Sequence, residues 1–259
     1  VLFRSIDMSG NNGVVFGVAN HRSIAWSIAQ ILNQAGVRLA LTYQNERLKE
    51  NVSALAHKLN NAIVLECDVS DDESVKRSFR TLGEHFGRLD VMVHSVAFAN
   101  KDDLTGSFSE TPREGVRLAL DISAYSLISM AKNAAPLMDA GGAIVTLTFD
   151  ASQRVYPGYN IMGTAKAALE NEVRQLAAEM GNRNIRVNAI SAGPLNTLSA
   201  RGIGGFLEMQ KIHAERAPLK RNITHQEVAQ AALYLCSNLS SGVTGTVLPV
   251  DAGYHIMAV

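Results

Sequence analysis

The chain has 259 residues, a length that suits one large α/β domain or two small ones. Apolar residues make up 47% of it, which is enough for a substantial core and excludes a disordered chain. Lysine plus arginine total 24 and aspartate plus glutamate total 24, so the formal net charge is zero, and the positive excess typical of nucleic-acid and membrane-surface proteins is missing.

Short apolar runs alternate with helical patterns along the whole chain. The helical pattern at 71–87 also has an acidic start and a terminal glycine, as helix ends favour. The expected elements are, in chain order, a strand at 13–18, a helix at 23–36, a strand at 37–43, a helix at 46–60, a strand at 62–69, a helix at 71–87, a strand at 89–97, a helix at 124–138, a strand at 142–149, a helix at 159–181, a strand at 185–193, a helix at 225–239 and a strand at 247–253.

This alternation predicts an α/β fold with a seven-stranded parallel sheet and helices on both faces. Right-handed crossovers make it a doubly wound, Rossmann-like sheet. No linker or internal repeat interrupts the pattern, so we expect a single dinucleotide-binding and catalytic domain over 1–259. The stretches 97–120 and 193–223 are expected to be irregular, and both follow strands at the edge where such folds bind ligands.

The segment GVVFGVANHRSIAW, residues 13–26, lies where a dinucleotide's phosphates would bind, between the first strand and the first helix. Gly17 keeps the tight turn, but the other glycines that usually surround a pyrophosphate are missing. Ser23 and the N–H of Ile24 are candidate phosphate donors, and Ser23 is also a candidate helix cap. On this stretch alone, an ordinary β-to-α turn is the favoured alternative.

The ends of the second and third strands are candidates for the adenosine half of the cofactor. Gln44 can hydrogen-bond a ribose, and no basic residue stands at that strand tip, which favours NADH over NADPH, although Arg47 follows nearby. Asp68 and Val69 lie where an adenine would be met, the alternative for Asp68 being a turn or helix cap.

Tyr159 and Lys166 are the candidate catalytic pair. They are seven residues apart, about two helical turns, so their side chains share one helix face. A nearby ammonium lowers the cost of negative charge on a phenol and can also hold ribose hydroxyls. The spacing is common by chance, but its position after the fifth strand of a nucleotide-binding pattern favours catalysis.

No apolar run in the chain is long enough to span a bilayer, and the first ten residues lack the long apolar core of a signal peptide. Cys67 and Cys236 form neither a disulfide framework nor a metal-ligand spacing. We therefore expect a cytoplasmic protein with two reduced core thiols and no metal, and neither a nucleic acid nor a membrane as partner.

The Tyr–Lys pair resembles that of the short-chain dehydrogenase/reductases, and within them the chain is similar to the NADH-dependent enoyl-(acyl-carrier-protein) reductases. The resemblance covers essentially the whole chain. In this subfamily a glycine-poor turn with a Ser–Ile pair is the usual phosphate site. The matching segments are GVANHRSIAW, LTYQNERLK, CDVSDD, VHSVAFA, LDISAYSL, YNIMGTAKAALE, VNAISAGPLNTLSARGIGGF, APLKRNIT and VTGTVLPVDAGYHIMAV.

The resemblance implies a role for each matching position. Tyr159 is the catalytic tyrosine, and Lys166 holds the nicotinamide ribose. The remaining cofactor contacts that it implies are Gly17, Ser23, Ile24, Gln44, Asp68, Val69, Ser95, Val96, Leu195 and Thr197. The substrate contacts are Ala99, Phe149, Tyr159, Met162 and Phe206.

The implied activity is the reduction of trans-2-enoyl thioesters by NADH in type II fatty acid biosynthesis, an oxidoreductase reaction of lipid metabolism. The substrate would be carried by acyl carrier protein or by coenzyme A, and a homotetramer is common among these folds. Phe149 departs from the bacterial pattern, which often has a tyrosine there; Phe also occurs at this position in the mycobacterial long-chain branch. Phe149 can shape the pocket but cannot donate a hydrogen bond.

Two alternatives remain at this point. A 3-oxoacyl thioester reductase usually has a serine about thirteen residues before the tyrosine, where this chain has Thr146, and an N-N-A-G run where it has HSVA. A non-catalytic cofactor-binding relative would have kept the fold and lost the activity, although Tyr159 and Lys166 are both present.

The stretch 197–213 is predicted to form a mobile substrate-binding flap over an acyl chain. A helix packed against the sheet edge is the alternative. The stretch has glycines at 202, 204 and 205, and its apolar residues are Leu198, Ile203, Phe206, Leu207 and Met209.

Overall fold

The computed structural model describes residues 6–197, 200 and 204–258. Its strands are β1 (Asn12–Phe16), β2 (Arg38–Tyr43), β3 (Ile63–Glu66), β4 (Val91–His94), β5 (Gly142–Thr148), β6 (Ile185–Ala192) and β7 (Val247–Val250). The α-helices are α1 (Ile24–Gln34), α2 (Glu46–Ala56), α3 (Asp72–Phe86), α4 (Lys101–Thr105), α5 (Arg113–Leu120), α6 (Ser126–Ala134), α7 (Asn160–Met180), α8 (Phe206–Arg216) and α9 (His225–Cys236). Short 3₁₀ turns cover Phe108–Glu110, Ala135–Leu137, Asp150–Ser152, Gly181–Arg183, Asn238–Ser240 and Tyr254–Ile256.

Within this described part, seven parallel strands form one sheet in the order β3-β2-β1-β4-β5-β6-β7. The order reverses between β1 and β4, where Val14 of β1 pairs with Met92 of β4 on one side and with Ala40 of β2 on the other. This confirms the predicted doubly wound parallel sheet. In such a sheet the ligand site lies at the carboxyl ends of the strands beside the reversal.

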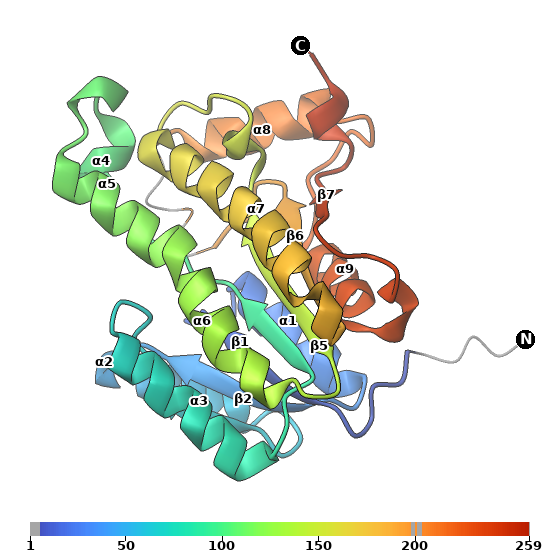
Figure 1. Ribbon diagram of the computed structural model, residues 1–259. Coiled ribbons are helices and arrows are strands. Elements are labelled where there is room, and N and C mark those ends of the chain that lie inside the picture. The colour runs from blue at the N-terminus through green and yellow to red at the C-terminus, as the bar shows by residue number, and fades with distance from the viewer. Residues whose placement is uncertain (1–5, 198–199, 201–203, 259) are drawn as a thin grey trace, which may run out of the picture.

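Helices cover both faces of the sheet (Figure 1). The core on one face joins the sheet to α1, α2 and α9, with Trp26 and Val228 among its buried side chains. The core on the other face joins the sheet to α3, α6 and α7, with Phe79, Met130 and Leu169 buried in it. Strands enclosed in this way have apolar side chains on both faces, which explains their unbroken apolar runs.

Local signals in the sequence account for several helix ends. The Ser23 hydroxyl accepts a hydrogen bond from the N–H of Trp26 and caps α1. Thr224 and Glu227 form a reciprocal capping box at the start of α9. Gly87, with a φ of 74°, ends α3 at the predicted residue.

The prediction of irregular structure at 97–120 is wrong, because this stretch contains α4 and α5. Helix α5 continues through a π-helical turn, Asp121–Tyr125, into α6. The extra residue in a π turn shifts the apolar period, so the sequence pattern shows a helix only after the shift. Gly115 lets α5 pack on α4, since a Cβ there would lie 2.3 Å from the Asp103 carboxylate.

The prediction for 193–223 is also wrong in part, because Phe206–Arg216 forms α8. In Figure 1, α4 and α8 lie above the carboxyl ends of the strands. Together with the π turn at Asp121–Tyr125, these two helices line the side of the active-site cavity that faces away from the sheet. None of the helices in the described part is both long enough and apolar enough to cross a membrane.

Candidate active site

A cavity of about 680 Å³ lies at the carboxyl ends of β1, β2, β4, β5 and β6. Its size falls within the range of small-molecule sites. The cavity brings together fifteen of the sixteen residues that the sequence predicts for cofactor or substrate. They are Gly17, Ser23, Ile24, Gln44, Val69, Ser95, Val96, Ala99, Phe149, Tyr159, Met162, Lys166, Leu195, Thr197 and Phe206.

Asp68 is the predicted site residue that does not line the cavity. Its carboxylate accepts hydrogen bonds from the N–H of Ser70 at 3.0 Å and from the Ser70 hydroxyl at 2.7 Å. These bonds hold the turn after β3, as the alternative of a turn cap predicts, and the adenine contact stays a prediction. Val69, the next residue, does line the cavity.

The turn after β1 makes its closest approach to the sheet at Gly17. Its φ is 88°, and a Cβ there would lie 1.9 Å from the backbone oxygen of Ser95, just beyond β4. Only glycine fits such a position without displacing the chain. Ser23 and Ile24, at the start of the eleven-residue α1, line the cavity beside it. A helix N-terminus with free N–H groups suits the phosphates of a dinucleotide, and this turn therefore fits the cofactor without a glycine-rich loop.

The Ser23 hydroxyl is already used within the turn. It donates to the backbone oxygen of Asn20 at 2.7 Å and accepts from Trp26. Its single proton is thus committed, and the backbone N–H groups of the first turn of α1 are the better phosphate donors.

Tyr159 is the N-cap residue of α7, one residue before the helix begins. Burial raises the pKa of its phenol above the ordinary value of 10.0. The expected lowering of this pKa by Lys166 is not what dominates in the structure. The phenol is therefore a neutral O–H donor at physiological pH, aligned at the cavity by an edge-on contact with the Phe149 ring, whose centroid is 5.2 Å away.

Lys166 lies two turns into α7 and is 5% exposed. Its Nζ donates a hydrogen bond of 2.8 Å to the backbone oxygen of Leu147 in β5. Burial lowers the pKa of the ammonium to about 8, and the charge of Glu170 opposes that shift. An ammonium has three N–H donors, and one of them is used on described residues, which leaves two for the hydroxyls of a bound ribose.

Glu170 and Thr148 form a second buried pair that the sequence reasoning missed. The Thr148 hydroxyl, at the end of β5, donates to Glu170 Oε1 at 2.8 Å. Glu170 is 4% exposed and follows Lys166 by one helical turn. The available signal was a carboxylate four residues after the lysine on a helix face that is otherwise apolar.

Thr146, thirteen residues before Tyr159, is fully buried and is not among the residues lining the cavity. The Ser126 hydroxyl donates to the oxygen of Ile122, so it must accept from His94 Nε2, at 2.8 Å. Nδ1 of His94 is then the acceptor for the Thr146 hydroxyl, at 2.7 Å. Burial and, secondarily, the charge of Lys166 lower the pKa of His94 to about 3, so the ring is neutral.

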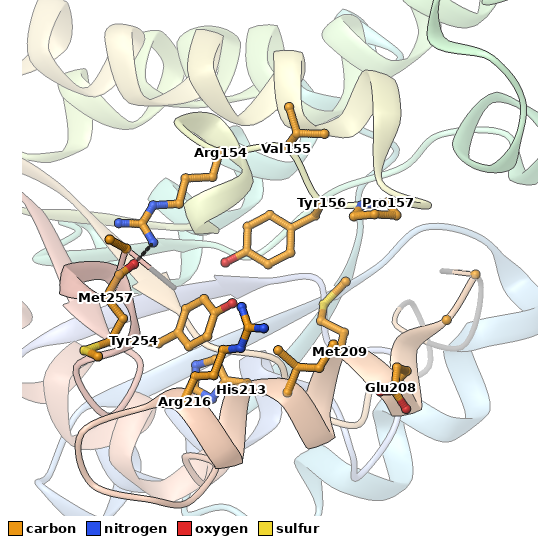
Figure 2. A pocket seen from close by; sticks show the side chains of 14 residues that line it. Arg154, Val155, Tyr156, Pro157, Glu208, Met209, His213, Arg216, Tyr254 and Met257 are labelled. Atoms are coloured by element: carbon orange, nitrogen blue, oxygen red, sulfur yellow. Dashed lines mark hydrogen bonds between the residues drawn. The ribbon is translucent and has the colours of Figure 1, made fainter.

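Tyr156 also packs on Phe149, with the two ring centroids 4.6 Å apart. Its hydroxyl donates to Asp150 Oδ2 at 2.9 Å. The residue lines a different cavity, shown in Figure 2. Tyr156 therefore does not supply the hydroxyl that Phe149 lacks.

Several lining residues were not singled out from the sequence as site residues. They come from the loop after β4, from α4 and the π turn, and from the segment after β6, and the ones with the largest side chains are Phe98, Leu104, Ile122 and Met209. Their common signal is weak: Phe98, Leu104 and Met209 are apolar residues in stretches predicted to be irregular, and Ile122 lies just after one of these stretches.

The predicted flap at 197–213 is described only in part. Leu198 and Ile203 lie outside the described residues. Phe206 and Met209 line the cavity from α8, whereas Leu207 is 77% exposed. The described portion is helical from Phe206, and two of its apolar side chains line the cavity.

The whole chain is similar to known reductases. A family model described as "Enoyl-(Acyl carrier protein) reductase" matches residues 17–255. An enoyl-(acyl-carrier-protein) reductase (NADH) of Nostoc sp. is 49% identical over 97% of this chain and 99% of its own length.

Two solved structures share the fold closely. The Bacillus cereus enoyl-acyl carrier protein reductase, solved with NADP+ and indole naphthyridinone, has a TM-score of 0.96 and 48% identity, covering 97% of this chain and 99% of its own. The Anaplasma phagocytophilum enoyl-(acyl-carrier-protein) reductase, solved with NAD, has a TM-score of 0.95 and 44% identity, covering 99% and 98%.

Proposed function

Because the chain belongs to the enoyl-(acyl-carrier-protein) reductase family of short-chain dehydrogenase/reductases, we propose that Tyr159 and Lys166 carry its reaction. The protein is an oxidoreductase of fatty acid biosynthesis that reduces enoyl thioesters with NADH. The observation that carries the assignment of residues is that Tyr159, Lys166 and the phosphate turn at Gly17 all line one cavity.

Bound NADH supplies the hydride that adds to the β-carbon of the trans-2-enoyl thioester. Negative charge then develops on the thioester oxygen, and a donor aimed at that oxygen stabilises the transition state. The neutral Tyr159 hydroxyl is that donor, since burial keeps its proton in place. A proton from solvent, directly or through this hydroxyl, completes the α-carbon.

Lys166 positions the cofactor. Its ammonium is fixed to β5 through Leu147, and its remaining N–H donors hold the nicotinamide ribose. The same positive charge favours the negative charge on the thioester oxygen. Leu195 and Thr197, after β6, bound the nicotinamide end, and Gln44 bounds the adenosine end.

Phe149, Met162, Ala99 and Phe206 enclose the acyl part of the substrate. All four line the cavity with Tyr159. The segment around 197–213 is the proposed flap, with Phe206 as the apolar contact that α8 contributes.

The alternative of a 3-oxoacyl thioester reductase is disfavoured by Thr146. Its proton is committed to the neutral His94 ring inside the core, so it offers no hydroxyl to a carbonyl in the cavity. A non-catalytic relative is disfavoured because Tyr159 and Lys166 both line the cavity.

The test follows NADH oxidation with a trans-2-enoyl thioester and, in parallel, with a 3-oxoacyl thioester of the same chain length. Turnover of the enoyl substrate with NADH preferred over NADPH supports the proposal. Turnover of the 3-oxoacyl substrate alone contradicts the proposed reaction. Cofactor binding without turnover of either substrate would favour the non-catalytic alternative.

Further properties belong to the same proposal. The substrate is carried as a thioester of acyl carrier protein, with coenzyme A as the alternative carrier. The free, buried thiols of Cys67 and Cys236 suit a cytoplasmic location. Exposed apolar side chains on the α5–α6 helix, at Tyr125 and Ile128, and the edge strand β7 suit contacts between subunits of a homotetramer. Light scattering tests the assembly.

A further inference from the structure

A second cavity, of about 430 Å³, lies on the other side of α8 from the active site. It is enclosed by α8, by the loop at 154–157 and by the C-terminal segment from Tyr254 (Figure 2). Met209 lines both cavities. The volume is within the range of ligand sites, and no step of the proposed reaction uses this cavity.

Most of the lining is apolar. Val155 and Pro157 contribute from the loop, Met209 and Ile212 from α8, and Met257 from the C-terminal segment. Val155 is 96% exposed, and in Figure 2 its side chain points away from the space between Tyr156 and α8. A ligand with a hydrocarbon portion would bury the apolar surface of Pro157, Met209 and Ile212.

One end of the second cavity is lined by two side chains with hydrogen-bond donors, Arg216 and Tyr254. The Arg216 guanidinium, in the last turn of α8, forms no hydrogen bond or ion pair with any residue in the described part of the chain, and the same holds for the Tyr254 hydroxyl. Both residues line the cavity, and in the view of Figure 2 their polar ends are directed into the space below Tyr156. Arg154 is different, because its guanidinium donates to the backbone oxygens of His255 and Met257.

A buried imidazole lies next to these donors. His213 is 3% exposed, its ring stacks on that of Tyr254 at 4.6 Å, and neither of its ring nitrogens has a hydrogen-bond partner among the described residues. Burial lowers the pKa of His213, so the ring is neutral and carries one N–H donor. Its Nε2 faces β6, since a Cβ on Gly193 would lie 3.0 Å from it.

The opposite end of the cavity is acidic. Glu208 lines it near the start of α8, eight residues before Arg216, which is about 12 Å along a helix. An anionic group is therefore attracted to the Arg216 end and repelled from the Glu208 end. This charge separation sets the direction in which a ligand with one charged end would lie.

We propose that this cavity binds an apolar monocarboxylate, with its carboxylate on Arg216 and the Tyr254 hydroxyl and its hydrocarbon chain along Met209 and Ile212. A guanidinium is well suited to a carboxylate, and the apolar lining excludes a purely hydrophilic anion as the best ligand. The site is distinct from the proposed catalytic one, and it extends the protein's binding chemistry beyond the proposed reaction. The hydrocarbon chain of the bound ligand would contact Met209, which also lines the active-site cavity.

The test is calorimetric titration of the full-length protein with decanoate, with decan-1-ol and inorganic phosphate as separate probes. We expect decanoate to bind more tightly than either. Arg216→Gln should weaken decanoate binding by roughly tenfold or more. Lys211→Gln, the same charge change on the same helix outside the cavity, should leave the affinity within about twofold.

Ile212 lines the second cavity and is not among the residues lining the active-site cavity, so Ile212→Trp should fill the second cavity and abolish decanoate binding there. NADH affinity in each variant reports that the protein is folded and is independent of whether the enzyme turns over. Unchanged decanoate affinity in Arg216→Gln and Ile212→Trp would place the carboxylate elsewhere and overturn the proposal. So would binding of decan-1-ol as tight as that of decanoate, or no binding of decanoate to the unaltered protein.

Discussion

Lys166 Nζ donates a hydrogen bond of 2.8 Å to the backbone oxygen of Leu147, and this bond ties α7 to the end of β5. Among the described residues that line the active-site cavity, Lys166 is the one buried cation. The bond to Leu147 fixes the ammonium at the cavity that Tyr159 also lines, and no carboxylate among the described residues lies within ion-pair distance of it. The charge state of Lys166 is consequently governed by burial and by Glu170 at longer range.

The first prediction concerns pH. Because the pKa of Lys166 is about 8, kcat/KM for an enoyl thioester should fall as pH rises above about 8 and the ammonium loses its proton. Glu170 raises that pKa, so Glu170→Gln should move the fall to lower pH. The measurement is the pH profile of NADH oxidation.

The control for this profile is Glu179→Gln, which makes the same charge change on an exposed turn of the same helix, α7. Glu179→Gln should leave the pH at which kcat/KM falls unchanged. If the alkaline fall of kcat/KM stays at the same pH in Glu170→Gln, then Glu170 does not influence the pKa of Lys166.

The second prediction concerns the proposed donor. Tyr159→Phe removes the hydroxyl and should lower kcat by roughly 10²–10³-fold, as loss of one oxyanion donor does. NADH affinity should be nearly unchanged, because the phenol is proposed to act on the thioester oxygen. Steady-state kinetics measure the change in kcat, and a separate NADH titration measures the change in cofactor affinity.

Tyr156→Phe is the matched control, since it removes a hydroxyl from a tyrosine that packs on the same Phe149 ring but lines the second cavity. It breaks a bond to Asp150 and should leave kcat close to that of the unaltered protein. Equal losses in the two variants would mean that general disturbance of the loop, and not the lost donor, slows the reaction.

The third prediction concerns the phosphate turn. Gly17→Ala places a Cβ 1.9 Å from the Ser95 backbone oxygen at a φ of 88°, so both strain and a clash result. Gly10→Ala has nearly the same φ, 86°, with no atom within 4 Å among the described residues. Gly10→Ala should cost roughly 1–2 kcal/mol of unfolding free energy, the price of a left-handed backbone alone.

Gly17→Ala should cost clearly more than Gly10→Ala and should also weaken NADH binding, because the turn after β1 must shift. Thermal unfolding and an NADH titration of both variants measure this. Similar losses of stability would show that the close approach to Ser95 relaxes at little cost.

The fourth prediction concerns acid stability. The pKa of His94 is lowered to about 3 in the folded protein and is 6.5 in the unfolded chain. Between these values the unfolded state binds more protons, so the unfolding free energy falls as pH drops from about 6.5 towards 3. One such proton contributes a slope of at most about 1.4 kcal/mol per pH unit.

His94→Gln should flatten this slope, although the lost contacts to Thr146 and Ser126 should lower stability near neutral pH by roughly 1–3 kcal/mol. His57→Gln, at an exposed position, should keep the slope. Denaturant titrations at several pH values give both quantities. An unchanged slope in His94→Gln would assign the acid sensitivity to other groups.

The sequence by itself determined the sheet, because buried parallel strands require unbroken apolar runs and their helices require an amphipathic period. It also placed Tyr159 and Lys166 on one helix face, since two turns of helix bring them into line whatever surrounds the helix. Short-range signals such as the Ser23 cap and the Gly87 helix end were predictable for the same reason: each acts within a few residues.

Only the tertiary structure decided what depends on contacts between distant segments. The π turn at Asp121–Tyr125 shifts the period of one long helix, which made α5 appear irregular in the sequence. The Asp68 carboxylate accepts hydrogen bonds from Ser70, and Thr146 gives its proton to His94 on another strand. Burial, which no local pattern fixes, sets the pKa of Lys166 and leaves His213 without a partner beside the second cavity among the described residues.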